Sequence, residues 1–503
     1  MTAESVVRAA DFSARFSDRL NPIVIKELRQ AVQSRFVVAA LMTLLSIQLV
    51  ALAIFLLASG DVLLNFDAGR QVFMLLYGIL LGIGMLFVPL YTGIRLAAER
   101  SDANVDLLFI TTIQPRSIIT GKLLAAIVLT VLIFSACMPF LVFTYFLRGI
   151  DLPSIFVVLA LGFLVIIACT QLAIFIASLP LGRGFKALFG VGALLLFAVM
   201  YFTAVAGSSE LVTQGIGSKL GRAAFWQGAG LAVLIFLFWC GLFFSLSVAL
   251  IMPPAANRAL PVRAFITGSW LVSGVVALLI SVSQKDHSPL MVWQIVFNIV
   301  FAIALFVAVS ERESIGRRVQ RAIPALGPSR GVAFFFYSGA ASGLAWASLM
   351  IVATLGLAWL WGKSHGGYMS LDDLHGSVKW LAGMCLYVLG YVLAGAALRR
   401  VLFRQLSVGL TWLLSVFLMA LGCIVPFLLG YLLFSSERWT SERFGAWMIG
   451  NPFAWSVHSY RPLYFLVASS LVVLTLALNA RGLLAQIRAF QPLPAATTQT
   501  EDA

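Results

Sequence analysis

The chain has 503 residues, of which 61% are hydrophobic and only 11% are charged. A soluble protein of this length could not keep so much apolar surface from water, so the composition excludes a soluble domain and is ordinary for a protein surrounded by lipid. The formal net charge of +14 does not indicate nucleic-acid binding, because the sequence offers no soluble basic domain to hold nucleic acid. We expect it to attract anionic membrane lipid instead.

A membrane-spanning helix needs about 20 apolar residues. The sequence predicts an all-α fold, a polytopic transmembrane bundle of about twelve spans. With the N-terminus in the cytoplasm, 24 of the 34 Lys and Arg residues fall on the cytoplasmic side. This bias follows the positive-inside rule, so both termini are expected to be cytoplasmic. The predicted spans are 36–58, 71–93, 117–147, 153–178, 185–206, 224–252, 265–283, 290–309, 332–361, 380–398, 406–434 and 459–479.

The spans and the polar segments beside them divide the chain into four parts. Residues 1–35 are predicted to form a cytosolic N-terminus with an amphipathic helix, and residues 36–252 a unit of six spans. Residues 253–488 are predicted to form a second unit of six spans. The tail, 489–503, is rich in Pro, Thr and Gln and is predicted to be disordered.

The amphipathic helix is predicted to begin at Asn21-Pro22, because Asn caps helices and Pro is tolerated at the first helical position. Its apolar and polar residues separate onto two faces, which is typical of a helix lying at a membrane surface. The competing interpretation is a basic flank of the first span. The apolar face holds Val24, Leu28, Ala31 and Val32, and the polar face holds Lys26, Arg29, Gln30 and Gln33.

The loop between the second and third spans, residues 97–116, combines acidic and apolar residues. Glu99, Asp102 and Asp106 recur at helical spacing, which predicts an acidic stripe. Leu107 and Leu108 follow as an apolar patch, and Gln114-Pro115 then marks a helix boundary. This combination favours docking to a protein surface. The alternative, a helix lying flat under the headgroups, is opposed by the carboxylates, which anionic lipid repels.

Two loops share a short pattern. Glu99-Arg100 and Glu311-Arg312 each follow an inward-going span, and each is followed by a Pro near an Arg, at Pro115-Arg116 and Pro328-Ser329-Arg330. The pattern would fit two parallel six-span halves divided near Pro253-Pro254, the second a degenerate repeat of the first. The competing interpretation, which poor residue identity elsewhere favours, is coincidence between generic basic loops.

The span centres carry no charged residue. A charge at a span centre costs about 2.5–3.5 kcal/mol and is found mainly where ions or protons move. The sequence therefore does not favour a proton-coupled or sodium-coupled carrier. The strongest polar groups within spans are Gln48, Gln171, Gln294 and Asn298. Two interpretations are open: these side chains form hydrogen bonds between helices, or they line a substrate path.

Catalytic, metal and cofactor sites are not predicted. The outer-loop residues His365, Asp372, Asp373 and His375 match no metal-binding spacing. The segment from Gly356 to Ser364 has five residues between its glycines, where a phosphate-binding loop has four. We therefore expect a protein that is not an enzyme, and ATP, if used, to be bound by another chain.

Two segments resemble the type-2 ABC-transporter permeases, in the branch of bacterial exporter subunits encoded apart from their ATPase. The first is Asn21-Pro-Ile-Val-Ile-Lys-Glu-Leu-Arg-Gln before span 1. The second runs from Glu99-Arg100 through Asp106-Leu-Leu-Phe-Ile-Thr-Thr-Ile-Gln-Pro-Arg to Gly121-Lys122-Leu-Leu. The likeness covers roughly residues 20–250.

The resemblance implies an elbow helix on the cytosolic leaflet and a coupling loop that contacts the ATPase. The elbow residues are Pro22, Lys26, Glu27 and Arg29, and the contact residues are Glu99, Asp106, Leu107, Leu108 and Phe109, beside which Asp102 lies on the acidic stripe.

The function we expect is that of a multi-pass permease subunit in the bacterial inner membrane, energised by a separate cytosolic ATPase. The alternative is a non-transporting membrane scaffold or assembly factor that recruits a soluble partner with the same loop. Residues 253–503 depart from the family, whose usual chain ends after six spans. The oligomeric state is therefore open: one chain is either a whole permease or half of a dimer.

Overall fold

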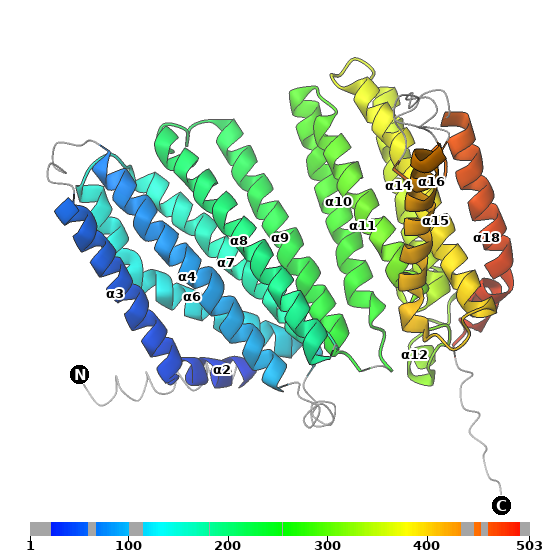
Figure 1. The fold of residues 1–503 in the computed structure, drawn as a ribbon, viewed down its shortest axis with the longest axis horizontal. Helices are drawn as coiled ribbons and strands as arrows, with labels where there is room; N and C mark the ends of the chain where they lie inside the picture. The colour runs from blue at the N-terminus through cyan, green and yellow to red at the C-terminus, as the bar shows by residue number, and fades with distance from the viewer. Residues whose placement is uncertain are drawn as a thin grey trace, which may run out of the picture. The chain divides into compact units, whose positions relative to one another are not determined.

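The computed structural model describes residues 22–58, 67–99, 114–180, 182–253, 255–433, 447–453 and 461–492. Within these ranges the chain is helical, and no β-strand is present. Twelve helices are long and apolar enough to cross a membrane (Figure 1). The all-α transmembrane fold predicted from the sequence is therefore confirmed, and the chain is a multi-pass membrane protein.

The helices pack into two units, the N-terminal unit, Met1–Pro253, and the C-terminal unit, Pro254–Ala503. In the N-terminal unit, the short helix α2 runs across the ends of the longer ones (Figure 1). Prolines begin or nearly begin several helices, where the missing N–H leaves no hydrogen bond unmade. The helices of this unit are α2 (Pro22–Val32), α3 (Arg35–Ala58), α4 (Ala68–Glu99), α6 (Pro115–Phe146), α7 (Leu152–Ser178), α8 (Arg183–Gln214) and α9 (Ala223–Ile251).

The core of the N-terminal unit lies along α4 and α7. Helix α4 packs against α3, α6, α7 and α8, and α7 packs against α4, α6, α8 and α9. Tyr77 of α4 is fully buried, stacked on Phe73 at 5.9 Å. A Cβ atom on Gly162 of α7 would lie 2.9 Å from the Tyr77 hydroxyl, so glycine lets the two helices approach closely.

The core of the C-terminal unit lies along α11 and α15 in the same way. Helix α11 packs against α10, α14, α15 and α16, and α15 packs against α11, α14, α16 and α18. Gly390 of α15 lies against Leu471 of α18, whose Cδ2 would be 2.8 Å from an added Cβ. The helices are α10 (Ala259–Gln284), α11 (Ser288–Val309), α12 (Arg317–Arg321), α13 (Gly327–Phe336), α14 (Ala340–Ser364), α15 (Leu371–Val401), η2 (Val408–Leu410), α16 (Thr411–Leu433) and α18 (Arg461–Ala489).

The ninth predicted span, 332–361, is wrong at its start. Residues 327–336 form the separate helix α13, and the span α14 begins only at Ala340. The apolar run continues through the break, so hydropathy does not show it. The break is held by hydrogen bonds: the Gly339 N–H donates to Glu311 Oε2 at 2.6 Å, and the Ser338 N–H donates to Asn257 Oδ1 at 2.9 Å.

Several helices also extend beyond their predicted spans. Helix α4 continues to Glu99 where the span was expected to end at residue 93, and α10 begins at Ala259 rather than 265. These extra turns carry charged residues, which end an apolar run in the sequence without ending the helix. Arg263, expected in a loop, therefore lies inside α10. Residues 1–21 and 493–503, including most of the expected disordered tail, lie outside the described residues.

The close approach of α4 to the end of α6 yields a test of the N-terminal unit. A Cβ atom on Gly69 would overlap the Arg148 carbonyl oxygen and would lie 2.6 Å from the Thr144 carbonyl oxygen. Both atoms belong to backbone, which cannot rotate away. We expect Gly69→Ala to destabilise the protein by about 1–3 kcal/mol, seen as a lower midpoint of thermal unfolding in detergent.

The matched control is Gly268→Ala in α10, where nothing lies within 4 Å of the added Cβ. There the substitution should leave the midpoint unchanged or raise it slightly, because alanine favours helix over glycine. Equal midpoints for Gly69→Ala and the parent protein would contradict this packing of α4 on α6.

Candidate docking site at the ends of α4 and α6

Helix α2 has two faces, as the periodicity predicts. Val24 and Ala31 are buried, while Lys26, Arg29 and Gln30 are exposed. The buried face lies mainly against α6. Glu27 shares this face because it follows Val24 by three residues and precedes Ala31 by four. Its carboxylate is therefore carried into the protein.

The partner of Glu27 is Lys122, two turns into α6. The Lys122 ammonium nitrogen lies 3.0 Å from Glu27 Oε1 and 2.8 Å from Glu99 Oε2. The side chains of Lys122 and Glu27 are 2% and 8% exposed, whereas that of Glu99 is 38% exposed. A buried ammonium group is tolerated when paired and hydrogen-bonded. We call Glu27, Glu99 and Lys122 the buried charge cluster.

The buried charge cluster joins three segments that are distant in the sequence. Glu27 belongs to α2, Glu99 is the last residue of α4, and Lys122 lies near the start of α6. Residues 100–113 leave α4 at Glu99 and return at Gln114, directly before α6. Both ends of the predicted coupling loop are therefore anchored to α2 through one lysine.

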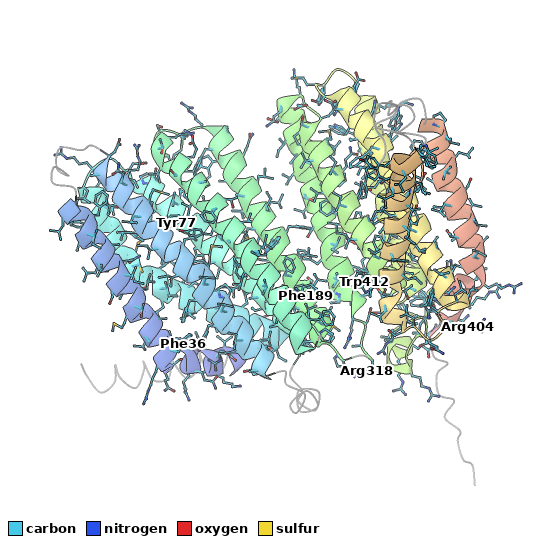
Figure 2. All side chains as sticks on the ribbon, viewed as in Figure 1. Phe36, Tyr77, Phe189, Arg318, Arg404 and Trp412 are labelled. Atoms are coloured by element: carbon cyan, nitrogen blue, oxygen red, sulfur yellow. The ribbon has the colours of Figure 1, made fainter. Side chains whose placement is uncertain are left out.

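Further contacts hold α2 and α3 to α4. Arg95 donates a hydrogen bond from Nη1 to the Tyr91 hydroxyl at 2.6 Å, and its Nη2 donates to the side chain of Gln30. Phe36, labelled in Figure 2, stacks on Tyr91 at 6.5 Å and contacts Phe87 at 5.5 Å. These contacts hold the start of α3 against α4, beside the buried charge cluster.

The sequence-predicted site residues fall into two groups. In the described part, Glu99 and Glu27 belong to the buried charge cluster, Lys26 lies 3.9 Å from Glu99, Arg29 is exposed, and Pro22 begins α2. The remaining coupling-loop residues lie outside the described residues: Asp102, Asp106, Leu107, Leu108 and Phe109.

Lys122 and the burial of Glu27 were missed as functional features by sequence reasoning. Lys122 was noted only within the family-like Gly-Lys-Leu-Leu segment, and Glu27 only within the elbow motif. One signal was available: Glu27 sits on the apolar face of its own helix, where an unpaired carboxylate would be costly. Such a residue predicts a buried cation nearby, although not which one.

The C-terminal unit holds a second set of ion pairs at the end where α12 and α13 lie. Arg263 of α10, 5% exposed at its side chain, lies 2.5 Å from Glu311 and donates to the Phe335 and Tyr337 carbonyl oxygens at 3.0 and 2.8 Å. Glu313 lies 2.7 Å from Arg399 and 3.0 Å from Arg400. From the sequence, Arg263 was only one of the 24 Lys and Arg residues counted on the cytoplasmic side.

Burial shifts the pKa of two charged groups near these ion pairs. Removal from water raises the pKa of the Glu311 carboxyl above its ordinary value, although Arg263 and the Gly339 N–H act in the opposite direction. Burial lowers the pKa of the Arg258 guanidinium, and the like charge of Arg312 lowers it further. This end of the unit therefore brings several arginines close together.

The four amide side chains that the sequence places within spans differ in their hydrogen-bond partners. Gln48 donates to the Leu76 carbonyl oxygen at 3.3 Å, and Gln294 donates to Ser377. Asn298 donates to the Gln294 carbonyl oxygen of its own helix at 2.8 Å, and its Oδ1 accepts from the Cys385 thiol of α15 at 3.9 Å. Gln171 is fully buried, and neither of its amide atoms has a partner among the described residues.

In the described part of the chain, there is little support for a metal site or a phosphate-binding loop. No group of three or more His, Cys, Asp or Glu side chains there could hold a metal ion. Residues 356–364, the nearest match to a phosphate-binding loop, lie inside the continuous helix α14. No protein family, curated protein or solved structure was found to match the chain.

The buried charge cluster predicts an order of effects on stability. Lys122→Met leaves the buried Glu27 without its cation, and removing one partner of a buried pair costs about 3–5 kcal/mol. Glu27→Gln should cost less, since Lys122 keeps Glu99, and Glu99→Gln should cost least because Glu99 is the most exposed member. Thermal unfolding in detergent would measure the order.

Lys26→Met is the control, because its side chain is 59% exposed and lies 3.9 Å from Glu99. We expect it to change stability by less than about 1 kcal/mol. Adding Glu27→Gln to Lys122→Met should restore part of the loss, since the uncompensated carboxylate is then gone. If Lys122→Met unfolds at the parent temperature, the cluster does not hold the three segments.

Proposed function

We propose that this protein is the membrane-spanning permease subunit of an ABC-type exporter in the bacterial inner membrane, energised by a separate cytosolic ATPase. The observation that carries the proposal is the buried charge cluster at the base of the loop with the acidic and apolar residues. The resemblance of residues 20–250 to type-2 permeases supports it independently, as do the twelve candidate spans.

The mechanism follows from how the loop is anchored. A partner that displaces residues 100–113 pulls on Glu99 and on the start of α6 together, because both are joined through Lys122. The end of α4 then carries the displacement inward, since α4 packs against four other helices of the unit. Transport in this scheme requires two discrete arrangements of these helices, between which the ATPase cycle switches the protein.

The energy source belongs to another chain in this proposal. Within the sequence, the nearest phosphate-binding pattern has the wrong spacing and lies in helix α14. ATP hydrolysis would therefore occur on a soluble subunit, and the acidic and apolar side chains of the loop, Asp106, Leu107 and Leu108 among them, would supply the contact.

Affinity capture of the full chain from native membranes in mild detergent tests the proposal. We expect a soluble protein with a phosphate-binding loop at near-equal abundance, identified by mass spectrometry. The double variant Leu107→Asp, Leu108→Asp should lose this subunit, because it puts two charges where the proposal expects apolar contacts. The matched control is Leu152→Asp, at the far end of the same unit, which should retain it.

Capture of no nucleotide-binding subunit would contradict the proposal. A soluble partner that is released by charge reversal of Glu99 and Asp106, without any change in flux, would support the membrane scaffold instead. ATP-dependent accumulation of a cargo in inverted vesicles, lost in the leucine variant, would separate the exporter from the scaffold.

A further inference from the structure

The two units use the same pairs of helices. Counting the six spans of each unit in chain order, the second packs against the first, third, fourth and fifth in both units. The fourth packs against the second, third, fifth and sixth in both, and the third contacts the sixth in both. Many other pairings of six helices would bury as much surface, so a shared pattern points to a shared fold.

Burial of the individual spans follows the same order. The second and fourth spans are the most buried of each unit, with 56% and 50% of the apolar stretch buried in the N-terminal unit and 50% and 61% in the C-terminal unit. The fifth span is the least buried in both, at 6% and 11%. The most buried and the least buried spans therefore stand at the same places in the two units.

We infer that residues 254–503 are a structural repeat of residues 1–253. We also infer that residues 311–337, which we call the α12–α13 segment, form a second docking surface, suited to an acidic surface of a cytosolic protein. The identity of that protein as the ATPase rests on the proposed function. Beyond that function, we assign the second docking surface a position and a positive charge. One chain then provides both docking surfaces.

The position of the segment is the first argument. The α12–α13 segment joins the second span of its unit, α11, to the third, α14, as residues 100–113 join α4 to α6. An acidic residue stands at the root of both loops, Glu99 and Glu311, and each is ion-paired to a buried cation of its own unit. In the C-terminal unit the third span is tied in through the Gly339 N–H, which donates to Glu311.

The segment is held in a fixed shape, as a docking surface requires. The Tyr337 hydroxyl donates to the Ala322 carbonyl oxygen at 2.5 Å, and Ile323 is buried. Phe334 and Tyr337 pack on Phe490, at the end of α18, with ring centroids 5.3 and 5.5 Å apart. A partner would therefore meet a preformed surface and lose little entropy in ordering it.

The charge of the segment defines the partner. Its two carboxylates, Glu311 and Glu313, are both paired with arginines from outside the segment. The outward surface is left with exposed guanidinium groups, among them that of Arg318 in α12, at one end of the unit (Figure 2). The exposed arginines of α12 are Arg317, Arg318 and Arg321.

A protein surface fits this segment better than a lipid surface. Helix α12 has five residues and carries exposed arginines around it, so it has no apolar face to insert between headgroups. In α13, Phe334 packs on Phe490, and Phe335 packs on Phe334. Only isolated apolar side chains point outward, Leu326 at 75% and Val332 at 63% exposure.

The composition of the purified complex tests the repeat. Native mass spectrometry of the full chain with the captured ATPase should show one membrane chain with two ATPase subunits, because each chain carries two docking surfaces. The chain alone should be a monomer. A complex of two membrane chains with two ATPase subunits would overturn the inference and leave the proposed function intact.

Site-specific photo-crosslinking tests the surface itself. A photoreactive residue at Val332 should form an adduct with an ATPase subunit of the complex, as should a photoreactive residue at Phe109. Arg317→Glu, Arg318→Glu and Arg321→Glu together should reduce the Val332 adduct by about tenfold, because like charges would then face the acidic partner. Arg404→Glu, an exposed change outside the segment, should leave the adduct unchanged.

The opposite end of the C-terminal unit supplies the negative control, a photoreactive residue at Met369, which is 70% exposed and should capture no cytosolic protein. Adducts to lipid alone at Val332, in vesicles with or without anionic lipid, would overturn the inference. So would an ATPase adduct at Phe109 with none at Val332. A soluble protein of another class, captured at Val332 in an arginine-dependent way, would support the surface and contradict the exporter.

Discussion

The N-terminal unit depends on one buried positive charge. Lys122 is almost wholly removed from water, and an unpaired ammonium group in that position would cost several kcal/mol. It can remain only where carboxylates reach it, and those of Glu27 and Glu99 come from two other segments. The positions of α2, of the end of α4 and of the start of α6 therefore depend on one another. Residues 100–113 connect two ends that are fixed in this way.

The helices were predictable from sequence because lipid imposes a length and a composition on every span. The faces of α2 were predictable for a similar reason, since helical periodicity separates Val24 and Ala31 from Lys26 and Arg29. The side-chain partners across the bundle were not predictable from the sequence. Lys122 and Glu27 are 95 residues apart, and nothing local in either segment names the other. Arg263 was assigned to a loop because a charge ends an apolar run, although helix α10 had already begun.

The start of α14 shows a different limit. Phe334, Phe335 and Phe336 continue the apolar pattern of the following span, so composition alone joins them to it. The chain breaks there because backbone groups find partners elsewhere: Arg263 binds the Phe335 and Tyr337 carbonyl oxygens, and Glu311 accepts from Gly339. These groups come together only after the unit has folded, so tertiary contacts decide a boundary that local preference leaves open.

Buried ion pairs contribute more to the choice of one geometry than to stability, since apolar replacements are often as stable. Both units place such pairs at the end of the second span, where the following loop begins, and the span centres rely on close packing and amide hydrogen bonds. A displacement of either loop would reach a joint in which charges resist separation, and would pass from there to the most buried helices of the unit. In the proposed exporter, the polar contacts would set which helices move together, and the apolar interfaces between them, which lack directional bonds, would allow the movement.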